Sequence, residues 1–359
     1  MRLSIISFTE NGKRLSEHIA DLLQKKIEIL LFTKCEACRK NSAVSPVLFV
    51  EKSLGDWAKE QMQEKNTLLF IGACGIAVRA IAPSLTDKLH DVPVLVMDER
   101  GRYVIPILSG HVGGANEWAG YLAGETGAEP VITTATDINK KFAVDLFAKR
   151  NNLFIENKDG IVKVSSKVLA GETITISIEP GHGADGTGKC CLPSGIRLAP
   201  YPPEVPVDVV VTSKEDKFDA SLVLRPREYV IGLGCKKGKA AEEIKAFITR
   251  KMEELGITAA QVYAVASISL KSGEQGIVSW CDKEGIPFLT YTAKELQEVK
   301  GNFTGSSFVR EKTGVDNVCE RAALKACGDK GTLLTPKYAE NGMTIAVAKR
   351  EWKVCVDEK

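Results

Sequence analysis

Strand-length apolar runs alternate with segments of helical periodicity, and this alternation constrains the fold more than any other feature of the chain. In the first 150 residues the apolar runs are Leu3–Phe8, Ile27–Phe32, Thr67–Ile71, Val92–Met97, Tyr103–Ile107 and Pro130–Thr133. The helical segments are Lys13–Gln24, Leu54–Gln63, Ile76–Ile81, Asn116–Thr126 and Lys141–Lys149. Such alternation is typical of a doubly wound, mainly parallel sheet. The sequence therefore predicts an amino-terminal α/β domain over residues 1–150.

The rest of the chain divides into two further parts. Residues 151–227 carry the strand-like runs Thr173–Ile178, Val207–Thr212 and Ser221–Leu224, which predict a small strand-rich middle domain with long loops. Alternation resumes in residues 228–359 and predicts a second α/β domain. The expected fold is thus two Rossmann-like α/β domains with mainly parallel sheets, joined by the middle domain. Three domains suit a chain of 359 residues.

The charge and hydropathy of the chain argue against two classes of partner. The formal net charge is only +2, with both signs interspersed, so nothing favours nucleic acid or an anionic membrane surface. No apolar run approaches the roughly 18 residues of a membrane span. Met1 and Arg2 lead directly into the first predicted strand, without a signal-peptide pattern. We therefore expect a cytoplasmic protein.

The most informative segment is the polar, glycine-rich loop Ser109–Glu117, which lies between a predicted strand and a predicted helix. A purely structural turn needs one or two small residues, whereas this loop holds a serine, a histidine, three glycines, an asparagine and a glutamate. The glycines would let a ligand approach, and the helix start would present free N–H groups to it. A second polar turn, Thr133–Asp137, follows the next strand. Both turns are expected at carboxyl ends of strands, where open α/β sheets bind ligands.

The polar residues of these turns have structural as well as functional interpretations. His111 either packs the loop or acts as a general base, because the pKa of a free imidazole lies near neutrality. Ser109 is a candidate nucleophile or hydrogen-bond donor, and we favour water as the nucleophile. Asn116 and Glu117 are helix caps or site residues, and Asp137 caps the next helix or orients His111. The Gly113–Ala115 amides are candidate oxyanion donors. The substrate-binding prediction at these turns comprises Gly110, Gly113, Gly114, Asn116, Thr133, Thr134 and Thr136.

A third turn in the first domain could hold a substrate carboxylate. Gly72 and Gly75 bracket the turn after a predicted strand, and Arg79 follows in an otherwise apolar helical stretch. Arg79 is either a surface residue or a fork for a carboxylate, which guanidinium geometry favours. Lys88 could serve in the same way.

The last domain begins with a GxGxxxG pattern at Gly232, Gly234 and Gly238. A dinucleotide site also needs an acidic residue at the end of the next strand, and that strand ends in Ser267-Ile268-Ser269. We therefore favour a tight turn with affinity for anions over a nucleotide site. The residues predicted to line a large polar ligand in this domain are Gly234, Lys236, Lys271, Glu274, Ser306, Ser307 and Glu320.

Cysteine and histidine usage predicts no protein-bound metal. Cys35 and Cys38 form a lone CxxC without a second pair at zinc spacing. The chain has only four histidines, which argues against a histidine-rich metal site. The other cysteines are scattered, as expected for small thiols in a reducing compartment.

Two long stretches of the chain resemble the cobalt-precorrin-5A hydrolases of anaerobic cobalamin biosynthesis. The amino-terminal resemblance lies in IGACGIAVRAIAPSLTDKLHDVPVLVMDE and SGHVGGANEWAGYLAGETGAEPVITTATD. The carboxyl-terminal resemblance lies in GLGCKKG, VASISLKSGEQGI, GVDNVCERAALKACG and LLTPK. The middle part is similar only in length, position and general pattern. Arg321 departs from the small or apolar residue found in relatives.

The resemblance implies an enzyme that opens the ring-A δ-lactone of a cobalt-bearing tetrapyrrole and releases acetaldehyde, giving cobalt-precorrin-5B. It implies no cofactor beyond the cobalt that the substrate carries, and neighbouring methyltransferases as partners. Our mechanistic hypothesis has His111, oriented by Asp137 or Glu117, activate a water, while Arg79, Lys88 and Lys236 pair with substrate carboxylates. Two alternatives are a non-catalytic corrinoid carrier and a nucleotide-dependent oxidoreductase, and the missing acidic residue disfavours the second.

Overall fold

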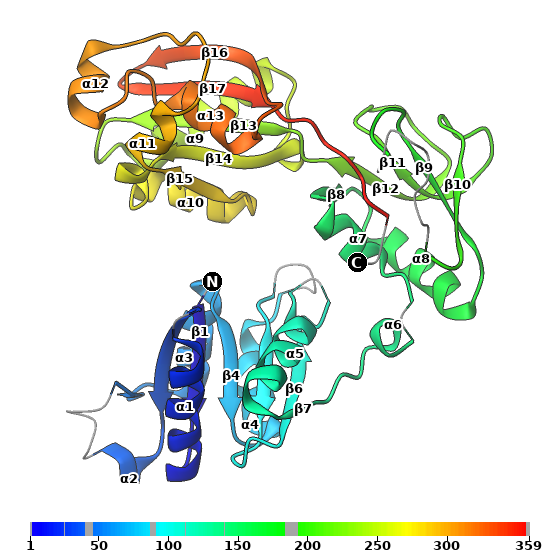
Figure 1. The fold of residues 1–359 in the computed structure, drawn as a ribbon, viewed down its shortest axis with the longest axis vertical. Coiled ribbons are helices and arrows are strands. Elements are labelled where there is room, and N and C mark those ends of the chain that lie inside the picture. The colour runs from blue at the N-terminus through cyan, green and yellow to red at the C-terminus, as the bar shows by residue number, and fades with distance from the viewer. Residues whose placement is uncertain are drawn as a thin grey trace. The chain divides into compact units, whose positions relative to one another are not determined.

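The computed structural model describes residues 2–24, 26–39, 46–86, 91–111, 113–139, 141–183 and 193–356. The chain forms two compact units, Met1–Leu146 (unit 1) and Phe147–Lys359 (unit 2). Among the described residues, unit 1 contains a seven-stranded sheet, and unit 2 contains two five-stranded sheets (Figure 1). The fold is the α/β class that the sequence predicted. The domain boundaries at residues 150 and 227 stay a prediction.

The sheet of unit 1 follows the predicted apolar runs closely. Its strand order is β3-β2-β1-β4-β5-β6-β7, and every neighbouring pair is parallel except β5 and β6. The strands are β1 (Arg2–Ser7), β2 (Glu28–Thr33), β3 (Leu48–Phe49), β4 (Thr67–Ile71), β5 (Val94–Met97), β6 (Tyr103–Leu108) and β7 (Glu129–Pro130).

The antiparallel pair β5–β6 departs from the uniform direction expected of a doubly wound sheet. Val94 pairs with Leu108, and Met97 pairs with Val104. Only residues 98–102 connect the two strands, whereas a parallel crossover needs a dozen or more. The Asp98 carboxylate accepts three backbone N–H groups of this turn and so fixes the reversal. The carboxyl end of β6 therefore lies at the edge of the sheet where β4 and β5 begin.

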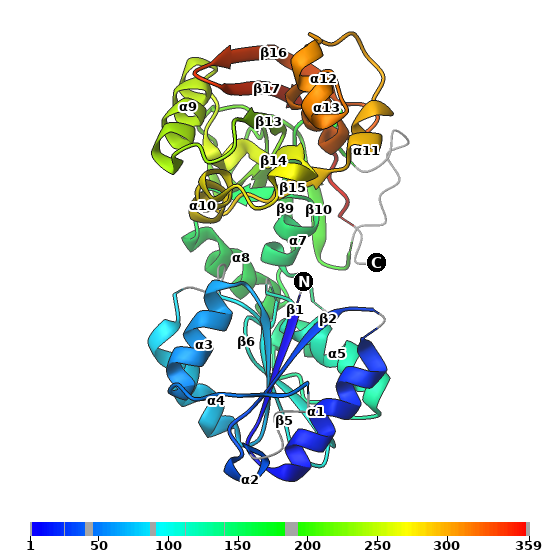
Figure 2. The ribbon, with the colours of Figure 1, turned by 90° about the vertical axis from the view of Figure 1, so that its left-hand side faces the viewer.

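Helices cover both faces of this sheet, as Figure 2 shows. On one face lie α1 (Glu10–Leu23) and α5 (Ala115–Thr126), and on the other lie α3 (Leu54–Gln63) and α4 (Cys74–Ile81). Alternation along β1 supplies both cores, since Leu3 and Ile5 face the first pair and Ile6 the second. The sequence did not predict the short elements α2 (Glu36–Arg39), η1 (Ala82–Ser84) and α6 (Ala135–Ile138), and α7 spans Val144–Arg150.

The first sheet of unit 2 has the order β10-β9-β11-β12-β8 and is parallel except where β8 joins β12. Its helix α8 (Asp159–Ala170) was not predicted, because valines and an isoleucine obscure its helical pattern. Gly160 lets α8 pack directly on β12, since a Cβ there would lie 2.3 Å from the Ser221 carbonyl oxygen. The strands are β8 (Leu153–Ile155), β9 (Ile174–Ile178), β10 (Ile196–Ala199), β11 (Val207–Val211) and β12 (Ala220–Pro226).

The second sheet of unit 2 has the order β15-β14-β13-β17-β16. Strands β13, β14 and β15 are parallel, and the hairpin β16–β17 adds two antiparallel strands beside β13. The elements are β13 (Tyr229–Cys235), α9 (Ala241–Glu254), η2 (Ala259–Gln261), β14 (Val262–Ile268), η3 (Ser269–Lys271), α10 (Gln275–Glu284), β15 (Phe288–Tyr291), α11 (Ala293–Gln297), α12 (Ser307–Thr313), α13 (Cys319–Cys327), β16 (Thr332–Glu340) and β17 (Met343–Lys349).

Close packing explains the glycines that begin the GxGxxxG pattern. A Cβ at Gly232 would lie 1.9 Å from the Cys319 carbonyl oxygen, because the start of α13 packs directly on β13. A Cβ at Gly234 would lie 2.6 Å from Thr344 Oγ1 on β17. Both glycines are thus required because neighbouring backbone and side-chain atoms approach them closely. This agrees with our preference for a turn over a dinucleotide site.

The segment after β17 returns to the first sheet of unit 2. Val354 pairs with Gly183, and Asn151 exchanges two hydrogen bonds with the backbone of Cys355. The Trp352 indole stacks on the His182 ring at 3.6 Å between ring centroids. Throughout the described ranges, every helix falls short of the length or apolarity needed for a bilayer crossing.

Candidate active site

The Ser109–Gly114 loop of unit 1 is tightly built. Ser109 has a left-handed backbone with φ 56°, which is rare for a side-chain-bearing residue. Its hydroxyl donates to the Asp91 carbonyl oxygen at 2.8 Å and so ties the loop to the segment before β5. Gly113 is required by close approach, since a Cβ there would lie 2.2 Å from the Ser109 Cβ. Ser109 therefore acts in the loop as a hydrogen-bond donor, and position 113 has no room for a side chain.

The amides at the start of α5 are not open to a ligand, contrary to expectation. Gly114 N–H donates to the His111 carbonyl, Ala115 N–H to that of Ser109, and Asn116 N–H to that of Gly110, each at 3.0 Å. The helix is capped by Gly114, with φ 89°, and not by Asn116 or Glu117. Of the three predicted oxyanion donors, only the Gly113 amide has no acceptor among the described residues.

Asn116 joins the two polar turns that the sequence singled out. Its side-chain amide donates to Thr134 Oγ1 at 3.0 Å, and Gly110 leaves room for its side chain. The two turns meet because β6 and β7 are parallel neighbours, so that the chain after each of them continues toward the same edge of the sheet. Thr133 and Glu117 are exposed at this edge. Lys88 lies outside the described residues, as do the side chains of Thr136 and Asp137 on α6.

The carboxylate beside His111 belongs to a residue that sequence reasoning missed. His111 Nδ1 lies 3.7 Å from Asp145 Oδ1, and the two side chains are only 12% and 14% exposed. Asp145 stands in the first turn of α7, within the helix predicted over Lys141–Lys149. The sequence feature that could have pointed to Asp145 is an acidic residue at the start of a predicted helix, shortly after the second polar turn. An imidazole with a carboxylate beside it at a glycine-rich loop is suited to general base catalysis.

The structure separates Gly72, Gly75 and Arg79 from this loop. They follow the carboxyl end of β4, whereas the Ser109–Gly114 loop follows the carboxyl end of the reversed strand β6. The four steps between the five residues of β4 span about 13 Å at roughly 3.3 Å each, so the two turns lie at opposite edges of the sheet. Arg79 is exposed, and its guanidinium lies over Gly75.

In unit 2, Glu274 organises the basic turn after β13. Its carboxylate accepts from Lys271 Nζ at 2.8 Å and from the Gly238 amide at 3.0 Å. Burial alone would raise the pKa of Glu274, but these hydrogen bonds outweigh it and hold the pKa below its usual value. Lys271 is thereby paired within the protein, whereas Lys236 is exposed beside Gly342. Gly234 lies in β13, just before this turn.

Glu320 has a structural role around the second sheet of unit 2. Its side chain is buried, and its two oxygens accept from the Thr304 and Lys337 amides and from the Asn317 side chain. Ser306 caps α12 by accepting from the Val309 amide, and Ser307 is the exposed first residue of that helix. Arg321 pairs with Asp316 at 2.9 Å and donates to two backbone carbonyls, which gives this unusual residue a structural role.

Both ends of the chain match known family models. The family model described as "Cobalamin synthesis G N-terminal" matches residues 56–137, which include the candidate loop. The model described as "Cobalamin synthesis G C-terminus" matches residues 229–348.

Similar proteins cover nearly the whole chain. The Cobalt-precorrin-5A hydrolase of Salmonella typhimurium is 32% identical over 90% of this chain and 93% of its own length. The protein of the same name from Priestia megaterium is 30% identical over 96% of this chain and 94% of its own length. Protein CobE of a Sinorhizobium species is 29% identical over 33% of this chain and 78% of its own length. The chain therefore belongs to the cobalt-precorrin-5A hydrolase family.

Proposed function

We propose that the protein is a cobalt-precorrin-5A hydrolase of cobalamin biosynthesis. It opens the ring-A δ-lactone of cobalt-precorrin-5A and releases a two-carbon fragment as acetaldehyde, giving cobalt-precorrin-5B. The observation that carries this proposal is similarity at 32% identity over 90% of the chain to a protein named for that activity. The pairing of His111 with Asp145 at the glycine-rich loop supports it, because lactone hydrolysis needs a base that activates water.

In the proposed mechanism, His111 removes a proton from the attacking water. The water oxygen bonds to the lactone carbonyl carbon, and the ester C–O bond breaks to leave a carboxylate and a hydroxyl group. The carbon that bears this hydroxyl then leaves as acetaldehyde, and the electron pair of the broken carbon–carbon bond stays on the macrocycle, which takes up a proton. Asp145 orients the imidazole and stabilises its protonated form. The Gly113 amide donates to the oxyanion, because it has no other acceptor among the described residues.

The proposal includes no resident cofactor. Hydrolysis consumes only water, and the cobalt arrives as part of the substrate. The proposed partners are therefore the cobalt-bearing tetrapyrrole and, as neighbours that exchange it, methyltransferases of the same pathway. Turnover that is unchanged after dialysis against a chelator would support this. Loss of turnover that Zn²⁺ or Mg²⁺ restores would contradict it.

The first test is anaerobic incubation of the purified protein with cobalt-precorrin-5A, with acetaldehyde and corrinoid mass followed together. Acetaldehyde, together with the mass change for one water gained and the fragment lost, is the expected result. An unchanged corrinoid that stays bound through gel filtration would favour a carrier instead. Tight binding of NAD(P) without either result would favour the oxidoreductase alternative.

A further inference from the structure

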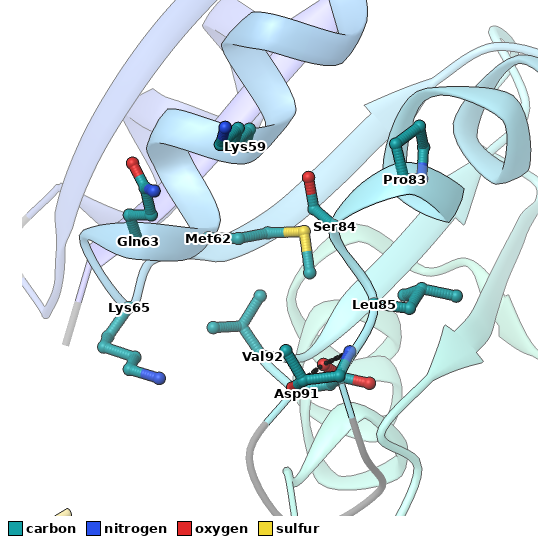
Figure 3. Close-up of a pocket in the computed structure, with 10 residues that line it drawn as sticks. Lys59, Met62, Gln63, Lys65, Pro83, Ser84, Leu85, Asp91 and Val92 are labelled. Atoms are coloured by element: carbon teal, nitrogen blue, oxygen red, sulfur yellow. Dashed lines mark hydrogen bonds between the residues drawn. The ribbon is translucent and has the colours of Figure 1, made fainter. Parts of the chain in front are cut away.

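A second polar feature lies beside the candidate loop in unit 1. A pocket of about 340 Å³ opens between α3 and the segment that follows α4. Figure 3 shows Lys59, Met62 and Lys65 of α3 and its end, with Val92 and Asp91 below Met62 and Leu85 to the right. The pocket lies at the sheet edge where β4 and β5 begin, which is also the edge where β6 ends. Asp91, which lines the pocket, accepts the Ser109 hydroxyl through its carbonyl oxygen at 2.8 Å.

The pocket combines two cationic side chains with an apolar wall. Lys59 and Lys65 are exposed, and within the described ranges no carboxylate lies at ion-pair distance from either ammonium. Met62 and Val92 are buried residues that supply apolar surface. Among the described lining residues Asp91 is the one acid, and its Oδ1 already accepts from the Thr86 amide at 2.9 Å and the Thr86 hydroxyl at 2.8 Å. The charge that these described residues present to a ligand is therefore positive.

The backbone at Lys65 suggests that its side chain has a use. Lys65 has φ 58°, a left-handed conformation at the end of α3 where glycine or asparagine is ordinarily favoured. The Lys65 amide donates a hydrogen bond to the Met62 carbonyl oxygen and so stabilises this conformation. On either side of Lys65, the buried Asn66 side chain donates to the Gln61 side chain at 3.0 Å. A lysine here costs conformational free energy that glycine would not.

We propose that this pocket binds one peripheral carboxylate side chain of the tetrapyrrole substrate. Lys59 and Lys65 pair with the carboxylate, and Met62, Leu85 and Val92 contact the carbon chain that carries it. A volume of about 340 Å³ is at the small end of the range for small-molecule sites, so it suits a side chain and not the macrocycle. Because Ser109 contacts the pocket lining, a carboxylate held here anchors the substrate next to the His111 loop. This inference rests on the proposed function for the identity of the ligand.

The kinetic test uses the double variant Lys59→Gln/Lys65→Gly with Lys52→Gln as the matched control. Glycine suits the left-handed backbone at position 65, so the variant is expected to fold. Lys52 lies just before α3, pairs with Glu60 and does not line the pocket. The double variant should raise KM for cobalt-precorrin-5A about 10- to 100-fold, as expected for loss of a charge-assisted hydrogen bond, with kcat changed by less than about threefold. Lys52→Gln should change neither. An unchanged KM in the double variant would overturn the proposal.

A second test does not depend on turnover. Acetic anhydride labels exposed lysines of the wild-type protein, and mass spectrometry reads Lys59, Lys65 and Lys52 separately. Cobyrinic acid, a corrinoid with free carboxylates, should protect Lys59 and Lys65 at least about fivefold, whereas its heptamethyl ester should protect neither. Sodium acetate at the same carboxylate concentration should also fail to protect. Equal protection by acetate would overturn the assignment to a substrate side chain, as would no protection by the corrinoid acid.

The two tests distinguish the failure of this proposal from the failure of the proposed function. Protection by cobyrinic acid without turnover of cobalt-precorrin-5A would leave the carboxylate pocket standing and remove the hydrolase. Normal turnover with neither protection nor a change in KM would leave the hydrolase standing and remove the pocket.

Discussion

The imidazole of His111 and the carboxylate of Asp145 are the pair on which the proposed chemistry depends. His111→Ala should lower kcat for cobalt-precorrin-5A about 10²- to 10⁴-fold, the range for loss of a general base. Release of acetaldehyde at pH 7 is the measurement, and the thermal unfolding midpoint shows whether the variant is folded. A folded His111→Ala protein with near wild-type turnover would remove His111 from the mechanism.

Asp145→Asn tests whether the carboxylate orients His111. The amide keeps the size of the side chain but loses the negative charge, so the imidazolium that forms during water attack is less stabilised. We expect kcat to fall at least about tenfold with little change in KM. A pH profile of kcat should also move, because a charge that favours the protonated imidazole is lost. A purely structural role for Asp145 would leave the pH profile where it was.

Glycines of the loop and of the helix that follows it should respond in opposite ways to alanine. Gly113→Ala places a Cβ 2.2 Å from the Ser109 Cβ and 2.8 Å from its carbonyl oxygen, so the loop must shift. We expect a loss of about 1–3 kcal/mol in the free energy of unfolding together with a large loss of activity. Gly120→Ala, in the middle of α5 with nothing within 4 Å, should stabilise by roughly 0.5–1 kcal/mol and leave activity intact. Equal effects in the two variants would contradict this account.

At the level of secondary structure, α8 is tied to its sheet by an ion pair between an exposed lysine and a buried carboxylate. Lys167 of α8 donates to Asp208 Oδ1 of β11 at 2.6 Å, and Thr175 of β9 donates to Asp208 Oδ2 through its amide and hydroxyl. Burial alone would raise the pKa of Asp208, but the hydrogen bonds from Lys167 and Thr175 outweigh it and hold the pKa below its usual value. The carboxylate therefore joins three elements only while it is ionised.

The lowered pKa of Asp208 predicts acid sensitivity with a defined sign. The unfolded chain, with an aspartate pKa of about 3.9, binds the proton more readily than the folded protein. The free energy of unfolding therefore rises with pH between the folded pKa of Asp208 and about pH 5. The contribution is complete above about pH 5 and disappears as the pH falls through the folded pKa. Asp208→Asn should lower the urea midpoint at pH 7 and make it less dependent on pH between pH 5 and 3. Asp216→Asn, in an exposed loop, is the control and should behave like wild type.

Local sequence signals account for most elements, and the exceptions have physical reasons. Strand β4 and helix α3 match their predicted bounds, because each has a clear apolar period between polar ends. The reversal of β6 was within reach of the sequence, since residues 98–102 are too few for a crossover. The hairpin β16–β17 was also within reach, because Asn341-Gly342 is a strong signal for a two-residue turn and both residues have positive φ.

The candidate site was predictable in part only. The sequence singled out the Ser109–Glu117 loop and the Thr133–Asp137 turn, because unusual residue types are concentrated there, but it did not predict the hydrogen bond between Asn116 and Thr134. It did not identify Asp145, whose approach to His111 depends on how the chain after α6 folds back. It also grouped Arg79 with the loop residues, although the reversed strand puts them at opposite edges. The first error concerns a contact between segments far from any shared pattern, and the second follows from the strand reversal that the short 98–102 connection imposes.

Across the whole of unit 2, the segment 350–356 connects two sheets that share no strand. It leaves β17, stacks Trp352 on His182, pairs Val354 with Gly183 and places Cys355 against Asn151 (red segment in Figure 1). Trp352 and Val354 are buried although they lie outside any helix or strand. The two sheets should therefore unfold together as long as this segment holds them.

Removal of the Trp352 side chain should uncouple the two sheets. Trp352→Ala deletes a side chain that is 3% exposed, at an expected cost of about 3–5 kcal/mol in the free energy of unfolding. Hydrogen exchange read by mass spectrometry should show faster exchange in β9 and β11, while β13 and β14 stay protected. Lys353→Ala changes the exposed neighbour in the same segment and should leave both sheets protected. Loss of a contact that couples two sheets should speed exchange in the less stable sheet and leave the other protected. Equal acceleration of exchange in both sheets by Trp352→Ala would therefore contradict the proposed coupling through this segment.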